Sequence, residues 1–157
     1  MIGRIKQLMF GADEADAPSA AAEDTVAAAA AAVMIEAAVM DGQFDDDERA
    51  TIARLLAERF EMTAADVETV LAEAERAVEN SVELFSFTRV LRDDFDHDDR
   101  VHMIEMLWEV AFADGVIHDY EANLIRRVTG LLHVTDRESG WARKRVLERL
   151  DIVDGAA

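Results

Sequence analysis

Residues 40–48 read Met-Asp-Gly-Gln-Phe-Asp-Asp-Asp-Glu, and residues 113–121 read Ala-Asp-Gly-Val-Ile-His-Asp-Tyr-Glu. The two stretches align at a constant offset of 73 residues. Each copy has an aspartate, a glycine directly after it and a glutamate seven residues later, which pairs Asp41 with Asp114, Gly42 with Gly115 and Glu48 with Glu121. A repeat that keeps acid, glycine and acid in register indicates two copies of one structural unit.

The chain is short, apolar enough to fold and strongly acidic. Its 157 residues fit one domain with a real core, and 51% of them are hydrophobic. The 34 acidic and 16 basic residues give a net charge of −18. Such a surface repels nucleic-acid phosphates and anionic membranes, so we expect no nucleic-acid partner. The charge is compatible with cations or a basic protein as binding partners. Alternatively, the acidic residues only keep the protein soluble.

The residues that the chain lacks exclude several classes of protein. It has no cysteine, which removes disulfides, thiolate catalysis and cysteine-based zinc sites. No run of about 20 apolar residues is present, so we expect no transmembrane segment. Residues 1–10 contain Arg4 and Lys6 but not the apolar core of a signal peptide. We therefore expect a cytoplasmic protein whose residues 1–10 dock on the domain, fray, meet a partner or contact a membrane peripherally.

Hydrophobic periodicity predicts helices throughout, since no segment alternates with a period of two. Residues 1–23 are expected to be an N-terminal segment and linker, because 11–23 are rich in Ala, Asp and Glu. The first helix is expected to begin with Asp24 or Thr25 as its cap and to run to Met40. Six further helix starts follow from capping and turn signals, at Asp45 with Glu48, Thr63, Ser81, about Asp98, His118 and Thr135 with Glu138.

These elements predict an all-α protein, namely a compact bundle of about seven helices built from two pseudo-symmetric three-helix units. The helical domain would span 24–157, with unit one at 24–79, a connecting helix at 81–92 and unit two at 97–150. We expect Trp108 and Trp141 to lie in its core, because both stand at helical spacing from other apolar residues.

Most acidic residues fit ordinary polar helix faces. One stripe has the spacing i, i+4, i+7 and i+11, formed by Asp98, His102, Glu105 and Glu109. We therefore expect Glu109 to be solvated and, through the repeat, Glu36 as well.

Asp41 and Asp114 differ from the other acids because each continues an apolar stripe at the C-terminal end of a helix. Asp114 stands four residues after Val110, and Asp41 stands four after Ala37. Both the helix dipole and burial oppose a negative charge there, so a compensating group is required.

Two interpretations supply that compensation. In the structural one, each aspartate accepts backbone N–H bonds from its own turn, which the following glycine permits. In the functional one, the two aspartates and the glutamates seven residues later surround a cation, and the four ligands are Asp41, Glu48, Asp114 and Glu121. Ligands of oxygen alone suit Ca²⁺, Mg²⁺ or Mn²⁺. The spacing differs from an EF-hand, in which the glutamate stands at position 12 and the glycine at position 6.

Nothing in the sequence indicates an enzyme. The four histidines have no i, i+4 pair and no Glu-x-x-His partner, which argues against a zinc or di-iron site. The serines lack a nucleophile elbow, and no glycine-rich phosphate loop is present.

The doubled phrase resembles the TerB-like tellurite-resistance family over about residues 25–150. The resemblance rests on Val39 to Gly42 with Glu48, and on Phe112 to Ile117 with Glu121. It implies a pseudo-twofold fold of about seven helices and, in some members, divalent-cation binding by acidic residues. On this chain those acids fall on Asp41, Glu48, Asp114 and Glu121. A related domain occurs on the N-terminal side of membrane-anchored J-domain co-chaperones. The first loop departs from the second, because Gln43-Phe44 replaces Val116-Ile117 and Asp45 to Asp47 add charge.

The resemblance favours a non-enzymatic stress or tellurite-resistance module that binds a divalent cation through these residues. The alternative is an acidic protein–protein interaction domain with no metal site and a basic partner.

Overall fold

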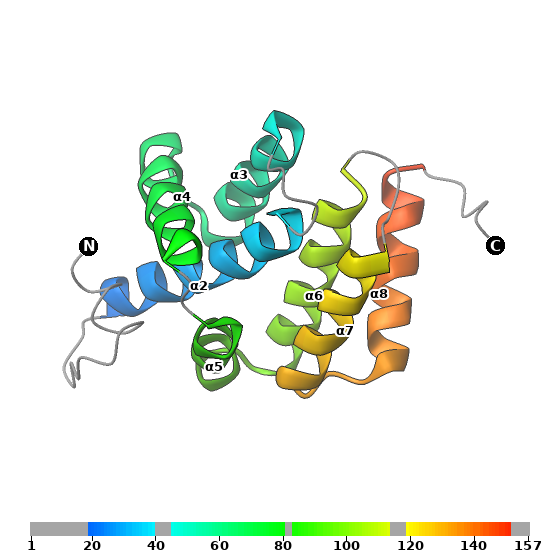
Figure 1. Cartoon of the computed structure of the whole chain (residues 1–157). Helices are drawn as coiled ribbons and strands as arrows, with labels where there is room; N and C mark the ends of the chain where they lie inside the picture. The colour runs from blue at the N-terminus through cyan, green and yellow to red at the C-terminus, as the bar shows by residue number, and fades with distance from the viewer. Residues whose placement is uncertain (1–18, 40–44, 81–82, 114–118, 152–157) are drawn as a thin grey trace.

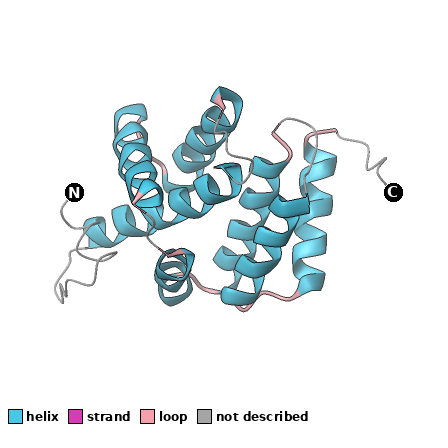
Figure 2. Ribbon diagram, in the orientation of Figure 1, coloured by secondary structure: helices cyan, strands magenta, loops and turns pink. Residues whose placement is uncertain are grey.

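The computed structural model describes residues 19–39, 45–80, 83–113 and 119–151. All the regular elements in these ranges are α-helices, which confirms the all-α fold class (Figure 2). The seven helices, labelled in Figure 1, are α2 (Ser19–Ala38), α3 (Asp46–Phe60), α4 (Ala64–Glu79), α5 (Leu84–Asp94), α6 (His97–Ala111), α7 (Asp119–Leu131) and α8 (Asp136–Arg149). None of these helices is long and apolar enough to cross a membrane.

Helix α2 lies at the centre of the bundle and packs against α3, α4, α5, α6 and α7. Figure 1 shows α3 and α4 above it, α5 below it, and α6 to α8 beyond its C-terminal end. The six consecutive alanines from Ala27 to Ala32 are all buried. Because alanine ends at Cβ, neighbouring helices can approach this stretch closely from every side, and a helix that is apolar all round must be buried.

The larger core side chains follow the predicted stripes. Ile52, Leu55 and Leu56 of α3 are buried, as are Leu124, Ile125 and Val128 of α7. This periodicity places one face of each outer helix against the core and leaves the opposite face for charged residues.

Several helix starts are confirmed at the level of individual hydrogen bonds. Asp45 caps α3 and Thr135 caps α8, each in a reciprocal capping box with the glutamate three residues later. Thr63 caps α4 by accepting the N–H of Asp66. Helix α6 begins slightly earlier than predicted, because Asp96 rather than Asp98 is its cap and accepts the N–H of Asp99.

The first helix and the connecting helix have different bounds from those predicted. Helix α2 begins at Ser19, within the segment expected to be a linker. The alanines at 20–22 explain the difference, since alanine has the highest helix propensity and the helix continues without an internal glycine or proline. The connecting helix α5 spans Leu84–Asp94 with Glu83 as its N-cap, and the predicted start at Ser81 lies outside the described residues. The division into two pseudo-symmetric units stays a prediction.

The two tryptophans have different environments, so the prediction for Trp141 is wrong. Trp108 is buried, and its indole Nε1–H donates to the Ser139 hydroxyl at 3.1 Å. Trp141 is 55% exposed. The residues three, four and seven positions after it are all charged, which places its side chain on the solvent face of α8; they are Lys144, Arg145 and Glu148.

Candidate functional site

The four predicted metal ligands fall in two groups. Asp41 and Asp114 lie outside the described residues. Glu48 and Glu121 occupy the first turns of α3 and α7, and both are buried, at 8% and 4% exposure. The two helices share neighbours, because each packs against α2 and α6.

Glu48 has a structural role at the start of α3. Its Oε1 atom accepts the backbone N–H of Asp45 at 3.2 Å, and its own N–H donates to the Asp45 carboxylate at 2.8 Å. These reciprocal bonds pair two N–H groups that have no partner within the helix. The positive end of the helix dipole also favours a carboxylate at this position.

The described residues alone do not assemble a metal centre. Within residues 19–39, 45–80, 83–113 and 119–151, no three His, Asp or Glu side chains lie close enough together to hold an ion. Asp45, Asp46 and Asp47 are exposed around the start of α3. A cation site that uses Glu48 or Glu121 therefore depends on Asp41 and Asp114, and it stays a prediction.

An ionic cluster built on one buried glutamate joins α3, α6 and α8, and we did not predict it from the sequence. Glu109 of α6 is only 3% exposed, so the prediction that it is solvated is wrong. Its two carboxylate oxygens accept bonds from Arg54 of α3 and from Arg149 of α8, the latter at 2.6 Å. Glu105, one turn earlier, binds Arg145 at 2.9 Å and Arg149 at 2.8 Å. We call Arg54, Glu105, Glu109, Arg145 and Arg149 the Glu109 cluster.

The Glu109 cluster stays ionised at neutral pH because its charges compensate one another. Burial by itself would raise the pKa of Glu109, but the hydrogen bonds from Arg54 and Arg149 outweigh it and lower the pKa. The pKa of Glu105 is lowered in the same way, against burial, by Arg145 and Arg149. The hydrogen bond to Glu109 raises the pKa of Arg54. A carboxylate with a lowered pKa is a poor general base. We therefore interpret the Glu109 cluster as a structural connection between α3, α6 and α8.

The sequence did contain a signal for this cluster. Glu105 and Glu109 are four residues apart on α6, and Arg145 and Arg149 are four apart on α8. Matching i, i+4 pairs of opposite charge can meet where two helices pack side by side, as α6 and α8 do.

Glu36, the repeat partner of Glu109, has a different environment. It is partly buried in α2, so the prediction that it is solvated is also wrong. Burial raises the pKa of Glu36, and the positive charge of Arg127 only partly opposes this effect. An ionised carboxylate here opposes folding, whereas the one at Glu109 is compensated.

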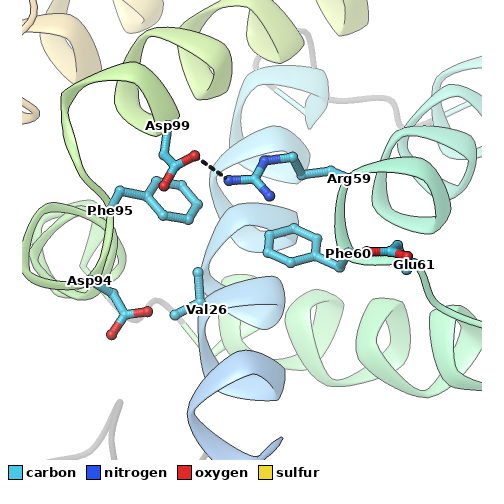
Figure 3. A pocket seen from close by; sticks show the side chains of 7 residues that line it. All are labelled: Val26, Arg59, Phe60, Glu61, Asp94, Phe95 and Asp99. Atoms are coloured by element: carbon cyan, nitrogen blue, oxygen red, sulfur yellow. Dashed lines mark hydrogen bonds and ion pairs between the residues drawn. The ribbon is translucent and has the colours of Figure 1, made fainter. Parts of the chain in front are cut away.

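A surface pocket of about 510 Å³ lies between the ends of α3 and α5, the start of α6 and the middle of α2. Figure 3 shows its lining residues, which are Val26, Arg59, Phe60, Glu61, Asp94, Phe95 and Asp99. We call it the Arg59 pocket. The guanidinium of Arg59 lies 5.3 Å from the ring centres of both Phe60 and Phe95, and it donates to Asp99 at 2.8 Å. Such contacts hold the arginine between two helices.

Comparison with known proteins gives one family. The model of the family described as Tellurite resistance protein TerB matches residues 27–144, from α2 into α8. No curated protein and no solved structure matches the chain.

Proposed function

This chain belongs to the family of the tellurite resistance protein TerB, and on that premise we propose that it is a non-enzymatic cytoplasmic module of a tellurite-resistance or stress response. In this proposal it binds a divalent cation through Asp41, Glu48, Asp114 and Glu121. The cation is Ca²⁺, Mg²⁺ or Mn²⁺, because all four ligands supply carboxylate oxygens.

The observation that carries the proposal is the burial of two glutamates at matching places in the repeat. Glu48 and Glu121 are 8% and 4% exposed, so two carboxylates from matching positions of the repeat lie inside the bundle and not on its surface. Each lies in the first turn of a helix, seven residues after an Asp-Gly pair.

Calorimetry with Ca²⁺, Mg²⁺ and Mn²⁺ on chelator-treated protein tests this function. Wild-type protein should bind at least one of these ions, and Glu121→Gln should abolish binding. Asp119→Asn is the matched control, because Asp119 is an exposed acid in the same helical turn and should not matter. Circular dichroism establishes that each variant is folded.

Binding should also appear as thermal stabilisation of the wild-type protein. An ion at 100 times its dissociation constant adds about 2.7 kcal/mol to the free energy of unfolding. The proposal is refuted if no ion binds, or if Asp119→Asn loses as much affinity as Glu121→Gln. The purely structural interpretation of the Asp-Gly turns would then stand.

The net charge of −18 favours a second candidate, an acidic interaction domain with a basic protein partner and no metal site. It predicts association with a Lys/Arg-rich peptide that weakens as salt rises. This association should survive Asp41→Asn and Asp114→Asn, substitutions that the cation-binding function does not tolerate. Loss of peptide binding in these folded variants refutes the second candidate.

A further inference from the structure

The Arg59 pocket combines an apolar lining with an acidic rim. Its apolar lining consists of Phe60, which is partly exposed, and of Val26 and Phe95, which are buried at its floor, whereas Glu61 and Asp94 are exposed at the edge. With Asp99 and Arg59 included, the lining carries three negative charges and one positive charge. Its chemistry therefore suits a segment that presents basic and large apolar side chains together.

Arg59 also has hydrogen-bonding capacity that its neighbours do not use. Its Nη2 atom donates to Asp99, but its Nε atom is buried and has no acceptor among the residues that the structure describes. Buried donors are nearly always paired, so an acceptor from outside the described ranges is expected here.

We propose that the Arg59 pocket is the docking site for the chain's own basic segment, residues 1–10. This segment reads Met-Ile-Gly-Arg-Ile-Lys-Gln-Leu-Met-Phe. It contains two basic residues and no acidic one, in a chain where acids outnumber bases by 34 to 16. Its apolar side chains match the lining, and Arg4 and Lys6 match the acidic rim.

The covalent connection makes this docking geometrically feasible. Residues 11–18 lie between the segment and Ser19, the first residue of α2. Eight residues extend to about 27 Å at most, at about 3.3 Å each. Val26 stands seven residues into α2, about 10 Å along the helix axis at about 1.5 Å per residue. The connection therefore spans the distance back to the pocket, and a tether of this length gives an effective concentration in the millimolar range.

Paramagnetic NMR on the full chain tests the proposal. Because the protein has no cysteine, Gln7→Cys carries a single nitroxide label. The label should broaden the amide signals of Glu61 and Phe95 several-fold more than those of Arg126 and Gly140, which line a separate pocket among α6, α7 and α8. The broadening should decrease in 1 M salt, where charges are screened within about 3 Å.

Charge reversals supply the matched controls. Asp94→Lys should remove most of the selective broadening, because it takes the net charge of the lining from −2 to zero. Glu148→Lys makes the same change in net charge at an exposed position on α8 and should leave the broadening intact. The proposal is wrong if both variants change the broadening to the same extent. It is also wrong if, in the labelled protein without a charge reversal, Glu61 and Phe95 are broadened no more than Arg126.

The same spin label distinguishes the proposal from two alternatives, in which residues 1–10 bind a second copy of the chain or a lipid surface. A mixture of spin-labelled protein without ¹⁵N and ¹⁵N-enriched protein without the label tests for docking into a second copy. Selective broadening of the ¹⁵N-enriched protein in this mixture overturns the intramolecular proposal. If the label causes no selective broadening at Glu61 in the free protein, and adding phosphatidylserine vesicles at equal salt immobilises the label, residues 1–10 bind a lipid surface instead and the proposal is wrong. Selective broadening at the pocket that is independent of protein concentration supports the proposal.

Discussion

Removing both arginines that neutralise Glu109 should destabilise the protein more when Glu109 is kept than when Glu109 is replaced as well. The reason is an asymmetry of burial within the Glu109 cluster. The side chain of Glu109 is 4% exposed, whereas those of Arg54 and Arg149 are 48% and 46% exposed. An arginine that loses its partner can be hydrated in place, but the buried carboxylate cannot.

The expected magnitudes follow from this geometry. A hydrogen bond to a charged group contributes about 1.5–3 kcal/mol, and the exposure of the arginines reduces this, so Arg54→Ala or Arg149→Ala alone should cost about 1–2 kcal/mol. The double variant leaves Glu109 buried and uncompensated, which should cost about 3–5 kcal/mol. Adding Glu109→Gln to the double variant should recover about 1–2 kcal/mol, because an amide is less costly to bury than a carboxylate.

Urea unfolding at pH 7 measures all four variants in a Trp141→Phe background, where Trp108 is the only tryptophan, and Trp108 fluorescence and circular dichroism should report the same transition. Trp108 is a suitable probe because it is buried in α6, next to Glu109 in sequence. Simple additivity of the two arginine substitutions, combined with no recovery from Glu109→Gln, would refute the reasoning. Costs below about 0.5 kcal/mol throughout would show that the cluster behaves as an ordinary surface ion pair.

Three other side chains test the packing and the pH dependence. Ala30→Leu should lower the free energy of unfolding in urea by about 1–3 kcal/mol, because Ala30 is fully buried in α2. The control Ala50→Leu, on the exposed side of α3, should lower it by less than about 0.5 kcal/mol. Equal costs would contradict the packing of α2. Glu36→Gln should raise the melting temperature at pH 7, because burial raises the pKa of Glu36 above its usual 4.5 and the ionised form opposes folding. That gain should vanish below pH 4.5, and a gain that persists in acid would point to another cause. Glu138→Gln should lower the melting temperature above pH 4.5, because the hydrogen bond from His97 and a backbone N–H lower the pKa of Glu138 to about 2. The difference from wild type should close as the pH falls from 4.5 towards 2, and a constant difference would exclude this linkage.

The parts of the fold that follow from local chemistry were predictable from the sequence. Asp45 with Glu48 and Thr135 with Glu138 are capping boxes because their side chains reach backbone groups only three residues away. Such contacts need no knowledge of the rest of the chain. The buried stripes of α3 and α7 were predictable for the same reason, since they depend only on helical periodicity.

The contacts between helices were not predictable in this way. Glu109 lies on a polar stripe when α6 is considered alone, and it is buried only because α3 and α8 place arginines over it. The early start of α2 at Ser19 is a separate case, because the acidic residues of 11–23 indicate a linker although the alanines at 20–22 favour a helix. Of the candidate site, the sequence located Glu48 and Glu121 in the first turns of α3 and α7, and the burial of both came only from the structure.

The position of α2 affects how the protein can be synthesised. The five described helices that α2 packs against, α3 to α7, all come later in the chain, and the last of them, α7, ends at Leu131. On a ribosome the alanine-rich helix is made early, and its apolar surface has no complete cover until most of the chain has emerged. Contacts of such long sequence separation slow folding and expose the nascent chain to aggregation. We therefore expect nascent chains that end before Leu131 to leave part of α2 uncovered and to be more prone to aggregation than the full chain.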